Sequence, residues 1–460
     1  MIGHVGTVTA VSTPPGKGGV AVIRVSGDDA LAVAAKCFVP KNGKPVSAVP
    51  PRRAVYGNIL LDGKIIDDGL LLYFPAPDSY TGEDVIELSC HGGSLLTGLV
   101  LEATLRAGAT PAPAGEFTRR AYLAGKLSLS DVEAVGLAID AVTPAQVRLA
   151  ASDSRNRLKD AIGGLHDRLL TLLSSLYASI DYPDEDLAEL TGKEIADGIQ
   201  KILSDLTALG ETYRTGRAIR EGLPAVIAGK PNVGKSAVFN RLLGEDAAIV
   251  TEIPGTTRDV LEYPLSVGRA LLRLADTAGL RDTSDPVETI GVERARKKIG
   301  KAEVLLLVLD TSRPQEEEDR ELLALAKEFS GVAVLLLNKC DLPAVWGKTD
   351  LPEGSPAAFS VSAETGKGFD EVTDYLSRSL TDETLSLGED AVVASARQSA
   401  AIGSACDDLA ACLDSLARGV PIDAAASLAE AALASLSEVD GRTVSGEIVD
   451  EIFSRFCVGK

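Results

Sequence analysis

Short apolar runs, separated by glycine and proline, dominate the first part of the chain. Each run has the length and composition of a strand, and one longer segment at 94–107 has helical spacing. The predicted strands lie at 5–11, 19–25, 54–61, 69–74 and 84–89. This pattern predicts an α+β domain over residues 1–118.

From residue 112 onward, apolar residues recur at the spacing of helices. Ser130 and Glu133 stand three residues apart, as in a capping box, which predicts the start of a helix there. Longer helices are predicted at 144–180, 193–220, 398–416, 422–437 and 445–456. We therefore expect one helical domain built from residues 119–216 and 381–460, with a further domain inserted at 217–380.

The inserted segment contains a strand, a glycine-rich turn and a helix, in this order. An apolar run at 223–228 precedes the octapeptide GKPNVGKS at 229–236, and helical spacing follows at 237–243. Glycines allow the backbone to approach an anion, Lys235 supplies a mobile positive charge, and Ser236 offers a hydroxyl to Mg²⁺. This stretch is predicted to be a phosphate-binding loop.

Three later motifs indicate that the nucleotide is GTP. The sequence DTAG at 276–279 follows an apolar run, so that a carboxylate faces the Mg²⁺. In NKCD at 338–341, Asp341 can accept hydrogen bonds from guanine, whereas adenine would leave that carboxylate unpaired. Ser362 and Ala363 complete the base pocket. The predicted GTP-binding residues are Asn232, Val233, Gly234, Lys235, Ser236, Ala237, Asp276, Thr277, Ala278, Gly279, Asn338, Lys339, Asp341, Ser362 and Ala363.

Leu280 stands where many GTPases have a glutamine that orients the attacking water. Another group must therefore stabilise the transition state. Asn232 and the loop 251–259 could hold a monovalent cation against the phosphates. Alternatively, Glu288 could position water or could be an ordinary residue of a solvated acidic helix, and the residues leave both possibilities open.

Composition limits the remaining possibilities. With 460 residues, 45% of them hydrophobic, the chain can fill two to four domain cores. Its net charge of −20 argues against broad attraction to a nucleic-acid backbone. The six cysteines lack metal-binding CxxC spacing, no run of about 18 apolar residues occurs, and the N-terminus has no secretory pattern. We expect a cytoplasmic protein.

Some polar residues of the N-terminal domain fall near predicted strand ends, where ligands often bind. They are Arg24, the segment 80–84 and the segment 91–93. Spacing alone favours ordinary turn chemistry and a surface ion pair over a binding site. Cys457, taken alone, is likewise more typical of a small hydrophobic residue than of a nucleophile.

Several motifs together resemble the MnmE/TrmE family of tRNA modification GTPases, across essentially the whole chain. These motifs are VIRVSG at 22–27, TGED at 81–84, GEFTRRA at 115–121, GKL at 125–127, IDYP at 180–183, GTTRD at 255–259 and FCVGK at 456–460. The resemblance implies an N-terminal α+β domain for dimerisation and folate binding, an all-helical domain from two chain segments, and an inserted Ras-like P-loop GTPase domain.

The resemblance also implies particular site residues. A 5-formyl-tetrahydrofolate-type cofactor would contact Arg24, Glu83, Lys126 and Lys460. The GTP-binding set would include Thr251, Thr256 and Thr257; K⁺ would be held by Asn232, Thr251, Ile253 and Thr256, and Mg²⁺ by Ser236 and Thr257. Glu288, Lys235 and Arg258 would contribute to catalysis of GTP hydrolysis.

The activity and partners that the resemblance implies are specific. The family works as a homodimer with a FAD-containing partner of the MnmG/GidA family, in a heterotetramer or larger complex. Together they add an aminomethyl-type group to C5 of the wobble uridine of certain tRNAs. The resemblance also makes Cys457 a candidate nucleophile toward uridine C6.

Two other classes of function compete with this prediction. A ribosome-assembly GTPase of the Era-like group would share the phosphate loop and Leu280, but it would carry a basic RNA-binding module, which the net charge does not favour. A folate-dependent one-carbon transferase regulated by GTP would turn over without GTP hydrolysis.

Overall fold

The structure is a computed structural model that describes residues 6–154, 156–181, 192–244, 262–275, 299–439, 441, 446–454 and 456–460. By internal contacts the chain divides into two compact units. One unit comprises residues 1–136 and 437–460, and the other comprises residues 137–436.

The first unit is built on a seven-stranded sheet with the strand order β3-β4-β5-β6-β2-β1-β7. Neighbouring strands are antiparallel except for the parallel pair β1 and β7. The strands are β1 (Val8–Val11), β2 (Val20–Ser26), β3 (Phe38–Pro40), β4 (Val55–Leu61), β5 (Lys64–Phe74), β6 (Val85–His91) and β7 (Thr110–Pro111). The predicted strands and the helix at 94–107 are therefore found close to their expected bounds.

Two helices cover one face of this sheet. Alternate strand residues such as Ile23, Ile59 and Leu88 point into one core, where they meet helices α1 (Ala30–Cys37) and α2 (Ser94–Arg106). The unit also contains the short helix η1 (Val46–Ala48), α3 (Glu116–Leu123), the start of α4 (Leu129–Asp140) and α15 (Gly446–Ser454). A further cluster of Val132, Val449 and Phe453 joins α15 to α4.

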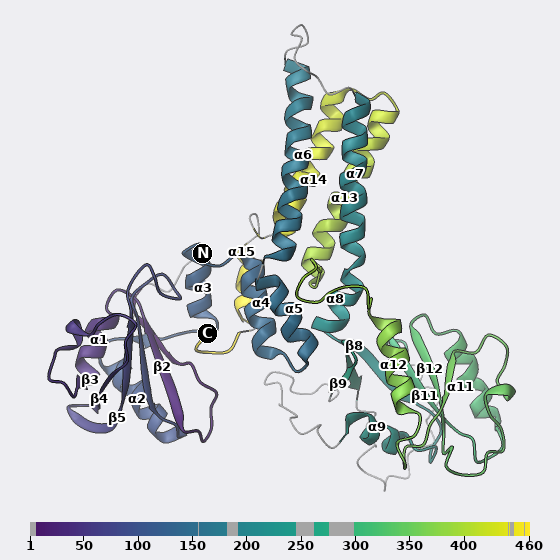
Figure 1. Ribbon diagram of the computed structural model, residues 1–460, viewed down its shortest axis with the longest axis horizontal. Coiled ribbons are helices and arrows are strands. Elements are labelled where there is room, and N and C mark those ends of the chain that lie inside the picture. Colours follow the sequence, from purple (N-terminus) through teal and green to yellow (C-terminus); the bar gives the residue numbers. More distant parts are fainter. Residues whose placement is uncertain are drawn as a thin grey trace. The chain divides into compact units, whose positions relative to one another are not determined.

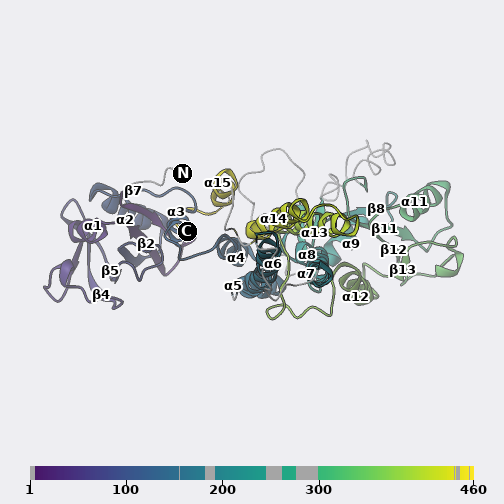
Figure 2. The same cartoon turned by 90° about the horizontal axis from the view of Figure 1, so that it is seen from above.

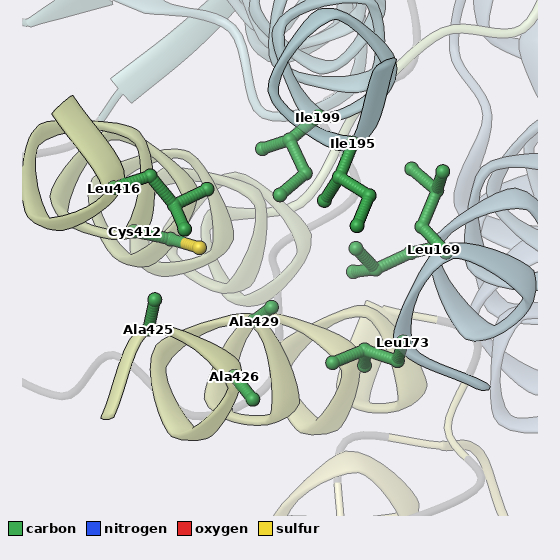
Figure 3. A pocket seen from close by; sticks show the side chains of 10 residues that line it. Leu169, Leu173, Ile195, Ile199, Cys412, Leu416, Ala425, Ala426 and Ala429 are labelled. Carbon is green, nitrogen blue, oxygen red and sulfur yellow. The ribbon is translucent and has the colours of Figure 1, made fainter. Parts of the chain in front are cut away.

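The second unit contains a helical bundle made from both helical segments of the chain. Helices α6, α7, α13 and α14 run alongside one another in both views (Figure 1; Figure 2). Their leucine, isoleucine and alanine side chains meet in an apolar core (Figure 3). The helices are α5 (Pro144–Ser154), α6 (Arg157–Asp181), α7 (Gly192–Glu211), α8 (Tyr213–Arg220), α13 (Ala396–Ala417) and α14 (Ile422–Val439). The chain thus forms one helical domain from two separate segments.

Three details of the helix predictions were wrong. The helix predicted at 144–180 is interrupted, because Asn156 has a φ of 58°, which a right-handed helix cannot contain. The helix predicted at 193–220 is also divided, at Thr212. Helix α4 is capped by Ser128 rather than Ser130: the Asp131 carboxylate accepts from the Ser128 N–H at 2.8 Å, and the Ser128 hydroxyl accepts from the Asp131 N–H at 3.2 Å.

The nucleotide domain contains a six-stranded sheet with the order β13-β12-β11-β8-β10-β9, parallel except at β9. Helices α9 and α12 pack on one face, and α11 packs on the other. The elements are β8 (Leu223–Ala228), α9 (Lys235–Leu243), β9 (Glu262–Val267), β10 (Ala270–Ala275), β11 (Val304–Asp310), α11 (Glu317–Lys327), β12 (Val332–Asn338), η3 (Lys348–Asp350), β13 (Ala357–Ser360) and α12 (Phe369–Leu380). Of the predicted motifs, the phosphate loop follows β8, NKCD begins at the last residue of β12, and Ser362 and Ala363 follow β13. These described motifs therefore lie at the carboxyl edge of this sheet, where α/β proteins bind ligands.

The fold is therefore a multidomain α+β and α/β architecture, as predicted. Among the described helices, none is both long and apolar enough to cross a membrane.

Candidate functional site

The phosphate loop connects the end of β8 to the start of α9, and its glycines leave no room for side chains. Gly229 has a φ of 147°, and a Cβ there would lie 2.4 Å from the carbonyl oxygen of Val308. Gly234, the N-cap of α9, has a φ of 100°, and its Cβ would lie 2.3 Å from Nδ2 of Asn338. These tight approaches and left-handed conformations suit a loop whose backbone cradles an anion.

Lys235 is folded back over this loop. Its Nζ donates to the carbonyl oxygen of Gly229 at 3.0 Å and to that of Lys230 at 2.7 Å. The ammonium therefore lies close to the loop backbone at the N-terminus of α9, where the helix dipole also favours negative charge. Ser236 and Ala237 follow in the first turn of that helix. The residues present fit a Mg²⁺–nucleotide phosphate at this position.

Asn338 joins the phosphate loop to the predicted base-binding loop. Its side chain is buried, its Nδ2 donates to the carbonyl oxygen of Val233 at 2.9 Å, and its Oδ1 accepts from the N–H of Ala363 at 3.0 Å. Ser362 is also buried, and its hydroxyl accepts from the N–H of Thr365 at 3.1 Å. Asp341, by contrast, is exposed at the same edge of the sheet. The structure thus brings together phosphate-loop and base-loop residues separated by more than a hundred positions.

Lys339 makes a second connection to the phosphate loop. Its Nζ donates to the Asn232 carbonyl oxygen at 3.2 Å and to Oδ2 of Asp310 at 2.6 Å. Burial alone would raise the pKa of the Asp310 carboxyl, but hydrogen bonds from Lys339 and Ser312 outweigh burial and lower that pKa. Sequence analysis missed Asp310. Its position at the end of an apolar run, beside the strand that carries Asn338, was the available signal.

Several predicted site residues lie outside the described residues, and their roles stay predictions. They are Thr251, Ile253, Thr256, Thr257, Arg258, Asp276, Thr277, Ala278, Gly279 and Glu288.

The residues predicted to contact folate gather around helix α3 in the first unit. The Arg24 guanidinium lies 5.4 Å from the ring centre of Phe117 and 5.6 Å from that of Tyr80. It also donates to Oε1 of Glu87, at 3.0 Å from Nε and 2.8 Å from Nη2. Arg24 therefore combines an aromatic contact with an ion pair that sequence analysis did not identify.

Glu83 belongs to a network of partly buried polar groups. Its Oε2 accepts from the Ser26 hydroxyl at 2.8 Å and from Nη1 of Arg120 at 2.7 Å. Nε of Arg120 also donates to Oε1 of Glu116 at 2.9 Å, and both of these side chains are buried. Sequence analysis missed Arg120, although Glu116 and Arg120 stand at the spacing of a helical ion pair.

The C-terminal tail is anchored to the start of α3 by backbone hydrogen bonds. The carbonyl oxygen of Lys460 accepts from the N–H of Phe117 at 3.1 Å, that of Cys457 accepts from Gly115 at 3.4 Å, and Val458 forms a β-bridge with Ala114. The Cys457 thiol is free and exposed. The C-terminal tail therefore lies beside the start of α3, the helix whose Phe117 ring contacts Arg24.

Lys126 and His91 complete the account of the predicted polar residues in this unit. Nζ of Lys126 donates to the carbonyl oxygen of Pro77 at 2.7 Å. Nδ1 of His91 lies 2.8 Å from Oδ1 of Asp67. The imidazole is exposed, whereas the Asp67 carboxylate is largely buried, so this contact is a local hydrogen-bonded pair.

Comparisons with known proteins cover nearly the whole chain. The family model described as the GTP-binding protein TrmE N-terminus matches residues 7–126, and the model described as the MnmE helical domain matches residues 129–457. The tRNA modification GTPase MnmE of Symbiobacterium thermophilum is 42% identical over 457 residues, covering 99% of both chains. That of Carboxydothermus hydrogenoformans is 39% identical over 461 residues, with the same coverage.

Solved structures match part of the chain. The G domain of the T. maritima FeoB iron transporter is 25% identical, covers 34% of this chain and 97% of its own, and superposes with a TM-score of 0.26. The full-length matches carry the assignment. On that evidence this chain belongs to the MnmE (TrmE) family of tRNA modification GTPases.

Proposed function

We propose that this protein is a K⁺-dependent GTPase that, with a FAD-containing partner, modifies C5 of the wobble uridine of certain tRNAs. The group added would be of the aminomethyl or carboxymethylaminomethyl type, and its one-carbon unit would come from a tetrahydrofolate. The proposal rests on the family relationship and on the arrangement of the two candidate sites.

The bridge made by Asn338 is the observation that best supports guanine-nucleotide binding. Its side-chain amide is hydrogen-bonded to Val233 in the phosphate loop and to Ala363 in the base loop. The distance between these two loops is therefore fixed. Such preorganisation favours one nucleotide geometry. Asp341, exposed at the same edge, would accept hydrogen bonds from the guanine edge.

Two of the proposed cation ligands, Asn232 for K⁺ and Ser236 for Mg²⁺, belong to the part of the site that the structure describes. Asn232 lies in the phosphate loop and Ser236 lies in the first turn of α9, so both are next to the proposed position of the phosphates, whose negative charge would attract the cations. When bound, Mg²⁺ and K⁺ would neutralise charge on the phosphates, and K⁺ would thereby take the role of the arginine that stabilises the transition state in other GTPases. Asn232 would hold K⁺, and Ser236 would hold Mg²⁺.

The cluster around α3 supports binding of an anionic, aromatic cofactor such as a folate. Arg24 offers a guanidinium beside the rings of Tyr80 and Phe117, and Lys126 offers an exposed ammonium. The cofactor would supply the one-carbon unit. The chain's own residues would bind and orient it, with Glu83 held in place by Arg120 and Lys460 fixed through its backbone.

Cys457 is proposed to be the nucleophile toward uridine. Its backbone is fixed against Gly115 while its thiol remains exposed, which suits attack on a substrate from solution. The thiolate would form an S–C6 bond by adding to the C5–C6 double bond, and the nucleophilic C5 would then form a bond to the one-carbon unit, which leaves its carrier. Removal of the C5 proton would restore the double bond and expel the thiolate. A Cys457→Ser variant is expected to hydrolyse GTP normally but to lose tRNA modification. Unchanged modification would make Cys457 structural, and Cys406→Ser serves as the control.

The decisive experiment compares GTP hydrolysis in KCl and in NaCl at equal ionic strength. The proposed mechanism predicts a rate at least about tenfold higher in KCl, because the cation replaces a catalytic side chain worth that much or more. A rate unchanged by the exchange would exclude K⁺ activation. Homodimer formation in the presence of a transition-state analogue, measured by light scattering, tests the dimeric state separately.

A tRNA modification assay separates this proposal from its competitors. Modification that requires GTP and fails with a non-hydrolysable analogue supports it. Modification that proceeds equally with the analogue favours a GTP-regulated transferase, and no modification under any condition favours an Era-like assembly GTPase.

A further inference from the structure

The carboxylate of Asp310 lies between the base-recognition motif and the phosphate loop, although it belongs to neither. It ends strand β11, and in the sheet its register partner is Asn338, the last residue of β12. Its side chain is 8% exposed and accepts from Nζ of Lys339 at 2.6 Å. A buried carboxylate so close to an ammonium makes a strong, charge-assisted hydrogen bond.

Asp310 itself is held rigidly. Its Oδ1 accepts from the N–H of Ser312 at 2.9 Å and from the Ser312 hydroxyl at 2.6 Å. Nε of Arg313, on an exposed side chain, lies 3.7 Å from Oδ2. Trp346 donates to the backbone oxygen of Asp310 at 3.1 Å. With its position fixed in this way, the carboxylate can hold Lys339 in one orientation.

Lys339 passes this constraint to the phosphate loop. The same ammonium that contacts Asp310 donates to the carbonyl oxygen of Asn232 at 3.2 Å. Both Lys339 and Asn232 have a φ of 65°, a left-handed conformation that costs free energy for residues with a Cβ. Such strain persists only where neighbouring groups hold the backbone in place. The hydrogen bonds from Lys339 to Asp310 and to Asn232 hold it in this way.

We propose that Asp310 is a positioning residue that couples guanine recognition to the phosphate loop, by holding Lys339 against Asn232. This inference deepens the proposed function and rests on it where K⁺ is concerned, since Asn232 is the proposed K⁺ ligand in the described part of the loop. Loss of the Asp310 carboxylate should free the Lys339 side chain, and Asn232 should then leave its left-handed conformation. Both nucleotide affinity and K⁺ activation should then weaken.

The test uses the full-length chain with the substitution Asp310→Asn, which keeps the shape of the side chain and removes its charge. Affinity for a fluorescent N-methylanthraniloyl-GDP is measured in NaCl and in KCl, and GTP hydrolysis is measured over a range of K⁺ concentrations. We expect about a tenfold loss of GDP affinity in both salts, which matches the loss of one charge-assisted hydrogen bond. The K⁺ concentration for half-maximal hydrolysis should rise at least about threefold. This effect is smaller than the loss of GDP affinity because the Asp310–Lys339 hydrogen bond acts on K⁺ only through Asn232.

The matched control is Arg313→Gln. It removes a charge beside the same carboxylate but leaves the contact with Lys339 intact, so both quantities should stay within about twofold of the unsubstituted protein. The inference would be overturned if Asp310→Asn changed neither the GDP affinity nor the K⁺ concentration for half-maximal hydrolysis. If these two quantities were unchanged but the variant melted at a lower temperature, the role of Asp310 would be purely structural, and the inference would also be overturned.

A second variant keeps the test decisive if Asp310→Asn does not fold. Lys339→Gln leaves the Asp310 carboxylate in place but removes the ammonium that contacts both Asp310 and Asn232. It should also raise the K⁺ concentration that gives half-maximal hydrolysis. An unshifted midpoint would contradict the inference. If the unsubstituted protein hydrolyses GTP equally in K⁺ and Na⁺, K⁺ activation fails, and GDP affinity in NaCl alone then decides the role of Asp310.

Discussion

The nucleotide edge and the cluster around α3 hold their charged groups in different ways. At the nucleotide edge, Lys235 donates to backbone carbonyl oxygens of its own loop, within six residues. Around α3, Arg24 and Glu83 are paired with charged side chains from other segments, namely Glu87 and Arg120. In the first site Lys235 is thus held by local backbone, whereas in the second site the charged groups are held by side chains from other segments.

The comparison shows what each site requires of its surroundings. A phosphate loop works through N–H groups and a helix dipole, so its charge complementarity is built into one short segment. The α3 cluster holds partly buried carboxylates and guanidinium groups, which are stable only if each keeps its partner. Removal of a single group should therefore affect function at the first site and stability at the second.

The largest effect is expected from Gly234→Ala. The new methyl group would lie 2.3 Å from Nδ2 of Asn338, and the backbone would keep a φ of 100°, which alanine disfavours. We predict a loss of GDP affinity of about 1,000-fold, because the loop and its bridge to Asn338 are both displaced. Fluorescent nucleotide titration measures it. Gly347→Ala, whose methyl group would meet open space, is the control, and equal affinities in the two variants would refute the argument.

The next effect is on stability and concerns Arg120→Met. This change leaves Glu83 and Glu116 without the guanidinium that each of them contacts. Breaking such buried pairs should lower the free energy of unfolding by about 3 kcal/mol. Calorimetry of the full-length chain measures the change, while GDP affinity should be unaffected. Arg106→Met, at an exposed pair with Asp62, is the control and should change little. A stable Arg120→Met protein would show that the α3 cluster does not depend on its partners.

The smallest effect concerns the pair formed by the exposed His91 and the largely buried Asp67. The hydrogen bond to Asp67 raises the pKa of His91 above its ordinary value of 6.5. The pair therefore stabilises the folded protein fully below pH 6.5, and this contribution is lost as pH rises through the higher pKa of folded His91. A His91→Asn variant should melt at a lower temperature than the unsubstituted protein in mildly acidic buffer and at the same temperature in alkaline buffer. A pH-independent difference would contradict the assignment.

The sequence predicted the sheets and the nucleotide motifs well, since both depend on local patterns. Strands such as β8 and β12 are nearly continuous apolar runs, and the GKPNVGKS loop has its glycines at fixed spacing. Helix interruptions were harder. The break at Asn156 depends on one left-handed residue in the polar stretch SDSRNR at 152–157, through which the predicted helix continued. The true cap of α4 at Ser128 lies just ahead of the predicted one.

Side-chain partners across segments could not be predicted from the sequence. Asp310 contacts Lys339 from another strand, Arg120 contacts Glu83 from a loop, and Phe117 meets Lys460 at the end of the chain. None of these pairs follows a periodic pattern, because strand order and tail docking bring the partners together.

The sequence by itself determined the phosphate-loop motif and the strand and helix on either side of it, because a phosphate loop is made from the backbone of consecutive residues. Only the tertiary structure decided how those segments are held. Asn338 and Lys339 reach the phosphate loop because β12 and β8 flank β11 in one sheet, and Asp310 holds Lys339 because it ends the strand between them. A hydrogen bond needs two groups within about 3 Å, and strand order rather than distance along the chain sets that separation.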